Sequence, residues 1–298
     1  MKTFNIIILT LSVLAIILIS HWLGQQAYQW LPSSAAIEAE PIGDLFSFLV
    51  TLGSIIFFGV TGVLSYSLLF YRAAKNDVSD GPALKGNNQL EVIWTVIPLL
   101  LVTWIAVYSY HIYQRMNVLG PLPMVDHFME TPAYAQTDSA VPQPVEKIDV
   151  LAKQWAWSFH YRDRQVTSSE LHLPVNHPVQ LSLTSADVLH GFYVPNFRIK
   201  QDIVPNRTIE FKFTPNRIGQ YQLQDSQFSG TYFATMNAPV YVESTASYEQ
   251  WLRKAAQKPL VPAQNAAKTE HEQNQSSVIH SHWQTVKPNI PSPVNAIK

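Results

Sequence analysis

Few side chains in this sequence combine a reactive type with an informative position. Glu91 stands at the start of a long apolar run, where a carboxylate can take up protons at a membrane boundary. His190, Asp225 and Met236 could together hold a metal ion through an imidazole, a carboxylate and a thioether. The 298 residues include no cysteine, so thiolate catalysis, disulfides and sites built on sulfur anions are excluded.

His190, Asp225 and Met236 allow two interpretations. One is a single copper ion bound by His190, Met236 and Asp225. The other is structural, with His190 as a buried, hydrogen-bonded histidine and Met236 filling a gap in the core. An electron-transfer copper site depends on soft, anionic sulfur, so we expect the structural interpretation and no metal bound by this chain. The sequence also contains no nucleophile–base pair and no phosphate-binding loop, so it gives little support for an enzyme active site.

The composition indicates a membrane protein. Charged residues make up 14% of the chain, against roughly 25% in soluble domains, and the deficit lies in three apolar runs near the N-terminus. The net charge is −1, and no basic patch suggests a nucleic-acid partner. Membrane lipid is therefore the expected environment, and nucleic acid is not an expected partner.

The first apolar run, residues 4–20, is short for a membrane span. Residues 1–36 therefore form either a signal peptide or a retained signal-anchor helix. The small residues at 33–36 could hold a cleavage site, and both alternatives remain open from the sequence.

Residues 45–71 and 92–114 are each long and apolar enough to span a bilayer, and they predict a two-helix transmembrane hairpin at 41–116. The loop between them carries three basic residues, Arg72, Lys75 and Lys85. Basic loops remain in the cytoplasm, so we expect everything after the hairpin to lie on the periplasmic or lumenal side.

The exported part changes in composition and in hydrophobic pattern along its length. Residues 117–146 are rich in proline and predict a linker, whereas residues 147–253 contain short alternating runs and turns that predict an antiparallel β-sandwich. A short helix is expected at 248–252. Residues 254–298 are polar and predict a disordered tail, in which His271, His280 and His282 would be solvated.

Three segments resemble a known family when taken in order. Residues 88–98 resemble the start of the second span of cytochrome oxidase subunit II, and residues 154–161 resemble the aromatic segment that opens its outer domain. Residues 187–195 resemble the stretch that carries its first copper ligand. The resemblance implies an α + β membrane protein of a bacterial energy-transducing membrane, with an N-terminal helix hairpin and an exported cupredoxin-like sandwich.

The family's dinuclear copper motif can be aligned with this sequence through Gly230, Thr231 and Met236. The two cysteine positions are then Asp225 and Ser229. The glutamate position is Gln227, the second histidine position is Phe233, and only His190 and Met236 are retained. The alignment therefore implies a subunit II that has lost its own copper centre.

Relatives without that centre belong to quinol oxidases or alternative terminal oxidases. The resemblance implies that this chain works with oxidase subunits I and III, that haem and one copper ion lie in subunit I, and that quinol is the electron donor. It also implies that Glu91 stands at the entrance of a proton path into subunit I. The other interpretation of Glu91 is a carboxylate favoured by the helix dipole at an N-terminus.

The remaining positions are assigned by the same resemblance. Trp155 and Trp157 match aromatic residues at the cytochrome c docking surface of copper-bearing relatives, but we expect packing roles here. A contact with subunit I is one role for the charged side chains at three positions, and solvated turn charges are the alternative. These positions are Asp187, Asp202 and Arg207.

Two other functions remain open from the sequence. The first is an oxidase subunit with a degenerate copper site that still accepts electrons from cytochrome c, which would need an acidic docking face. The mixed charges of residues 148–244 do not supply one. The second is a membrane-tethered β-sandwich scaffold with no oxidase partner, which leaves the pattern at residues 91–98 without a purpose.

Overall fold

The computed structural model describes residues 2–72, 86–116, 145–276 and 286–296. It divides into two compact units. One contains the long helices, and the other contains residues 32–40 together with the chain after residue 116. Most of the predicted linker at 117–146, and also Lys75, Lys85, His280 and His282, lie outside the described residues.

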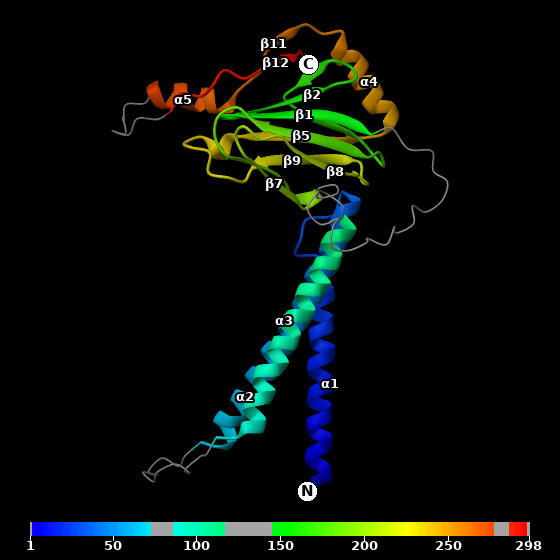
Figure 1. Cartoon of the computed structure of the whole chain (residues 1–298), viewed down its shortest axis with the longest axis vertical. Helices are drawn as coiled ribbons and strands as arrows, with labels where there is room; N and C mark the ends of the chain where they lie inside the picture. The colour runs from blue at the N-terminus through cyan, green and yellow to red at the C-terminus, as the bar shows by residue number, and fades with distance from the viewer. Residues whose placement is uncertain (1, 73–85, 117–144, 277–285, 297–298) are drawn as a thin grey trace, which may run out of the picture. The chain divides into compact units, whose positions relative to one another are not determined.

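The helical unit consists of α1 (Lys2–Ala27), α2 (Glu40–Phe70) and α3 (Asn88–Met116), drawn in blue to green in Figure 1. All three are long and apolar enough to cross a membrane. The two predicted spans are therefore helices, and the short first run belongs to a longer helix than the sequence predicts. The side-chain oxygen of Asn87 accepts hydrogen bonds from the Gln89 and Leu90 amides (3.0 and 3.3 Å), which caps the start of α3.

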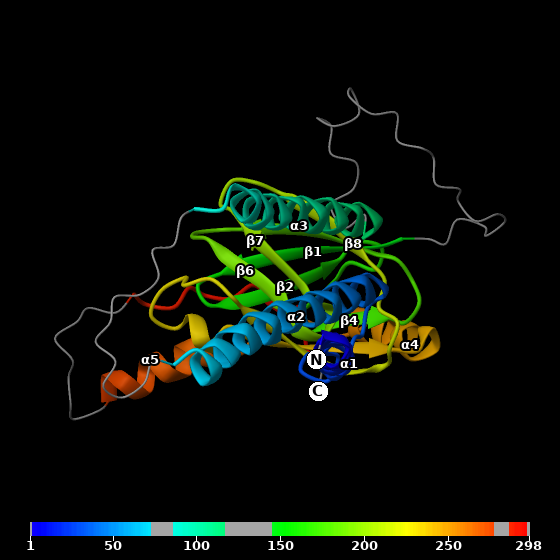
Figure 2. The same ribbon diagram turned by 90° about the horizontal axis from the view of Figure 1, so that it is seen from below.

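The outer unit is a sandwich of two five-stranded sheets, seen edge-on in Figure 1 and from below in Figure 2. One sheet has the order β3-β2-β1-β5-β8, and the other has the order β4-β10-β9-β6-β7. The first sheet consists of β1 (Glu146–Lys153), β2 (Ala156–Tyr161), β3 (Val166–Ser168), β5 (Val179–Ser185) and β8 (Ile209–Phe213). The second consists of β4 (Leu171–Pro174), β6 (His190–Val194), β7 (Ile199–Ile203), β9 (Gly219–Asp225) and β10 (Asn237–Glu243).

Alternation along the strands explains how the core is filled. In β8, Phe211 and Phe213 point inward and are each 1% exposed, as the period-two pattern predicts. The sandwich itself confirms the predicted fold class, but not every pairing is antiparallel. The β1–β5 and β4–β10 pairs are parallel. Strand patterning identifies the buried face of a strand and leaves its neighbour unspecified, so the sequence could not give this detail.

The prediction of a disordered tail is wrong for the part that the structure describes. After α4 (Thr245–Ala256), which contains the expected short helix, the chain forms β11 (Leu260–Pro262), α5 (Ala266–Ser276) and β12 (Pro293–Asn295). We call residues 258–276 and 286–296 the C-terminal strap. Its α5 lies at the opposite end of the sandwich from α4 in both views (Figures 1 and 2).

The strap is held by specific contacts. Ala267 is fully buried in the sandwich core, and the side-chain oxygen of Asn295 accepts a hydrogen bond from the Thr167 amide (2.8 Å). His271 is 7% exposed, and its Nδ1 lies 3.1 Å from the hydroxyl of the buried Tyr232. The expectation that His271 is solvated is therefore also wrong. A polar segment docks here because its few apolar and hydrogen-bonding groups find partners on the sandwich.

The variant His271→Ala tests whether this docking stabilises the outer unit. It leaves the buried Tyr232 hydroxyl without its partner, so we expect the free energy of unfolding to fall by about 1–3 kcal/mol. Glu272→Ala is the matched control, because Glu272 is exposed on the same helix and should change stability by no more than about 0.5 kcal/mol. Urea denaturation of the purified chain measures both. Equal stability of the two variants would contradict the docking.

Candidate functional site

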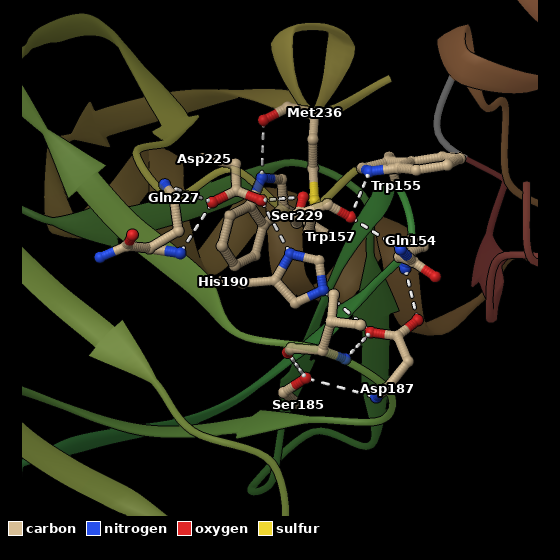
Figure 3. A network of polar contacts seen from close by, with 12 residues as sticks. Gln154, Trp155, Trp157, Ser185, Asp187, His190, Asp225, Gln227, Ser229 and Met236 are labelled. Carbon is tan, nitrogen blue, oxygen red and sulfur yellow. Dashed lines mark hydrogen bonds and ion pairs between the residues drawn. The ribbon is translucent and has the colours of Figure 1, made fainter. Parts of the chain in front are cut away.

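A cluster of hydrogen-bonded polar side chains in the sandwich centres on His190. His190 is the first residue of β6 and is fully buried. Its Nδ1 lies 2.8 Å from Oδ2 of Asp225 at the end of β9, and its Nε2 lies 2.9 Å from Oδ1 of Asp187 in the loop between β5 and β6. Figure 3 shows the ring between the two carboxylates. Both ring nitrogens of His190 are therefore occupied by hydrogen bonds within the protein.

Asp225 is the most highly connected side chain of the cluster. Besides His190, its carboxylate accepts hydrogen bonds from the Gly191 amide (2.7 Å), the Gln227 amide (3.0 Å) and the Ser229 hydroxyl (2.7 Å). A buried carboxylate needs such donors, because each unsatisfied oxygen would retain its desolvation cost. Asp225 thus joins β6 to the loop between β9 and β10.

Asp187 is held on the other side of the ring. It accepts hydrogen bonds from the backbone amides of Gln154 (2.7 Å) and Val188 (2.8 Å). The side-chain amide of Asn289, in the C-terminal strap, donates a further bond (2.9 Å). The strap therefore completes the shell of the cluster, and Figure 3 shows its ribbon beside Trp155.

The two tryptophans pack beneath the same loop. Trp155 and Trp157 are 2% and 4% exposed. Their indole N–H groups donate to the carbonyls of Ser229 and Met236, each at 3.1 Å. Trp155 also packs edge-to-face on Tyr232. Both indoles thus serve as core residues that fix the backbone of the loop.

The other predicted positions fall in different surroundings. Met236 is 1% exposed and lies in the core, whereas Phe233 is half-buried and packs against the exposed ring of Phe228. The Gln227 side-chain amide donates to Asp202 (2.7 Å), which connects Asp202 to the edge of the cluster. Arg207 is exposed in the turn between β7 and β8 and lies outside these contacts.

Glu91 belongs to the helical unit. It lies in the first turn of α3, one turn beyond the Asn87 cap, and its side chain is exposed. The Thr95 hydroxyl donates to the Glu91 carbonyl at 2.8 Å. The position suits a carboxylate for electrostatic reasons, because the helix N-terminus carries partial positive charge.

The electrostatics of the cluster favour a charged imidazole. Burial by itself would lower the pKa of His190, but the hydrogen bonds to Asp225 and Asp187 and the charges of those carboxylates outweigh it and raise the pKa. Burial by itself would raise the pKa of Asp187, but hydrogen bonds from the Gln154 amide and His190 outweigh it and lower the pKa. Each ring nitrogen faces a carboxylate oxygen, and the protonated imidazole, which donates from both nitrogens, fits this geometry.

Sequence reasoning missed two members of the shell. Ser185, whose hydroxyl accepts from the Asp187 amide (3.3 Å), belongs to a run of alternating strand residues and carries no distinguishing pattern. Asn289 lies far along a polar tail. The spacing of Asp187 and His190, three residues apart in a turn, was the one local signal that the two could meet.

Three apolar helices and an exported two-sheet sandwich define a membrane-anchored protein with a cupredoxin-like outer domain. Residues 20–112 match the family model "Cytochrome C oxidase subunit II, transmembrane domain", and residues 166–245 match "Cytochrome C oxidase subunit II, periplasmic domain". The chain therefore belongs to the subunit II family of haem-copper oxidases. It is a membrane protein whose sandwich lies on the outer side.

Several curated proteins are similar over most of their length. Cytochrome c oxidase subunit 2 of Synechocystis sp. is 31% identical, and the match covers 87% of this chain and 85% of that protein. Cytochrome c oxidase subunit 2 of Thermostichus vulcanus is 34% identical, with coverage of 83% and 85%. Quinol oxidase subunit 2 of Bacillus spizizenii is 27% identical, with coverage of 72% of this chain and 63% of that protein.

The raised pKa of His190 predicts how stability changes with pH. Its contribution is complete below the ordinary pKa of 6.5 and is lost as the pH rises through the higher folded-state value. We therefore expect the difference in unfolding free energy between the wild type and His190→Gln to shrink from pH 6 toward alkaline pH. Denaturation at several pH values measures it.

His177→Gln is the control for this experiment, because His177 is half-buried and bonds only a backbone carbonyl. The deficit of this variant should be small, because it loses one hydrogen bond at a half-buried position. A His190→Gln deficit that grew as the pH rose would show that the imidazole is held in its neutral form.

Proposed function

We propose that this chain is a subunit II without its own copper centre, in a terminal oxidase that takes its electrons from quinol. The observation that supports this most strongly is the His190 cluster. Both imidazole nitrogens and the Asp225 carboxylate are already bound within the protein, at the positions that the family alignment assigns to copper ligands.

The residues at these positions do not fit a dinuclear copper centre. Two copper ions held close together need bridging thiolates, and the corresponding side chains are the Asp225 carboxylate and the Ser229 hydroxyl. Neither is soft, and serine is not ionised at neutral pH. Phe233 offers no donor atom where the alignment expects a histidine. No electron-transfer step is therefore assigned to this chain.

The functions that remain for this chain are to anchor the complex and to take up protons. The chain would anchor the complex beside subunits I and III, while haem and one copper ion in subunit I reduce oxygen. Electrons would enter from lipid-soluble quinol within the membrane. Glu91, exposed in the first turn of α3, would collect protons for the path into subunit I.

The alternative donor is cytochrome c. Two relatives above 30% identity are named cytochrome c oxidase subunit 2, whereas the quinol oxidase subunit is 27% identical. We favour quinol because electron entry depends on donor atoms at a few positions, and these positions have changed in this chain. Overall identity is dominated by the fold and does not report on those atoms.

Oxygen uptake by the purified complex distinguishes the two donors. We expect uptake with reduced quinol, none with reduced cytochrome c, and a copper content that corresponds to one ion in subunit I. The positive control restores the donor set with Asp225→Cys, Gln227→Glu, Ser229→Cys and Phe233→His, and its copper content should rise. Uptake with cytochrome c, or excess copper in the unmodified complex, would overturn the proposal.

The role of Glu91 is tested by Glu91→Gln, which keeps the size of the side chain and removes its charge. We expect quinol-dependent turnover to fall several-fold, because proton delivery is slowed, while the yield of assembled complex stays unchanged. Gln89→Ala, in the same exposed turn of α3, is the control and should leave turnover unaffected. Normal turnover in Glu91→Gln would remove Glu91 from the proton path.

A further inference from the structure

The segment between α1 and α2 is built into the outer domain. Ala35 and Ala36 are fully buried and belong to the core of the sandwich. The Ala35 amide donates to the Asn196 carbonyl (3.0 Å), and the Ala35 carbonyl accepts from the Asn216 amide (3.0 Å). Two backbone hydrogen bonds and a place in the core make this segment a structural part of the domain.

The residues on either side are held as well. The side-chain amide of Asn196 donates to the Ser33 carbonyl (3.1 Å), and the Thr214 amide donates to the Glu38 carboxylate (3.0 Å). The guanidinium of Arg198 donates to the Ala39 carbonyl (2.7 Å). Residues 33–36 of this segment are the small residues in which the sequence suggests a signal-peptide cleavage site. Cleavage there would remove part of a buried, hydrogen-bonded strip.

A second and independent contact involves the helix before this segment. The Ser47 hydroxyl of α2 donates to the Gly24 carbonyl of α1 (2.8 Å), and both Ser20 and Ala27 of α1 are fully buried. Gly24 permits the close approach: a Cβ at this position would lie 1.9 Å from Oγ1 of Thr51. Small residues and interhelical hydrogen bonds are the usual means by which membrane helices associate.

We propose that α1 is not a cleaved leader but is retained as a third membrane span, packed on α2 through Gly24. The contacts of residues 33–39 with the sandwich and the contact of α1 with α2 together support this proposal. Cleavage near Ala36 would open the sandwich core, and cleavage before Ser33 would leave α2 without the helix that covers Ser47. The retained helix ties the membrane part to the outer domain at a second point of the chain, ahead of the hairpin.

The absence of native cysteine allows a direct test in the assembled complex. An ideal Cβ at residue 24 lies 3.2 Å from Cβ of Thr51. Disulfides need Cβ atoms about 3.5–4.5 Å apart, so a slight separation of the helices brings Gly24→Cys and Thr51→Cys into bonding range. The control pair is Gly24→Cys with Gly53→Cys, because a Cβ at residue 53 meets no atom within 4 Å.

After mild oxidation, we expect the test pair to resist labelling by a maleimide reagent and the control pair to label at both thiols. A chymotryptic peptide that contains residues 32–45 should be found intact by mass spectrometry of the purified, unmutated complex. A mature chain that begins after Ala27 would carry one thiol in either variant and would overturn the proposal. The intact mass of the purified, unmutated chain checks retention of α1 without a substitution at Gly24, and a mass that lacks residues 1–27 would equally overturn the proposal.

Discussion

The outer domain depends on one ionic arrangement, the His190 imidazolium between Asp187 and Asp225. Removing three ionisable groups from water is costly, and it is tolerated only where each finds hydrogen-bond partners and opposite charge. The backbone amides of Gly191, Gln227 and Val188 supply those partners, so strand β6, the β5–β6 loop and the β9–β10 loop must come together around the ring. The cluster thus links these segments through hydrogen bonds and opposite charge.

The indoles beneath the loop extend this constraint to the core. Trp155 and Trp157 donate hydrogen bonds to the carbonyls of Ser229 and Met236, so the segment that follows Asp225 is held by the core as well as by the cluster. Gly230 adopts φ +116° beside Trp155, a conformation that side chains of other residues rarely allow. The loop is held in this form by the indole hydrogen bonds to its carbonyls and by the hydrogen bonds of the Gln227 amide and the Ser229 hydroxyl to Asp225.

Much of the fold follows from local patterns, and the parts that do not share a physical cause. Apolar runs predict α2 and α3 because lipid requires satisfied backbones over a fixed length. Alternation predicts the inward Phe211 and Phe213. The strap at Ala267 and Asn295 escapes prediction because a few long-range contacts, and no periodic pattern, order it. The composition of a segment indicates how much of it is buried on average, but not which residues it contacts.

Only part of the site is predictable from the sequence, because the sequence gives the type of each side chain but not its contacts. The absence of cysteine already excludes thiolate ligands from this chain. The mutual hydrogen bonding of His190, Asp225 and Ser229 depends on distances between loops that only the folded chain sets. Asn289 is the clearest case, since it reaches Asp187 from far along the sequence. Which residues surround a group is a property of topology, whereas what a group can do is a property of its side chain.

The core of the sandwich draws Ala36 from ahead of the two hairpin spans and Ala267 from near the end of the chain. Contacts between such distant segments form late, because the intervening chain must first be ordered. The outer domain therefore cannot complete its core while the chain is still emerging. Completion of this core therefore has to follow the synthesis of α2, α3 and the C-terminal strap, so the order of the chain sets the order in which the outer domain can close.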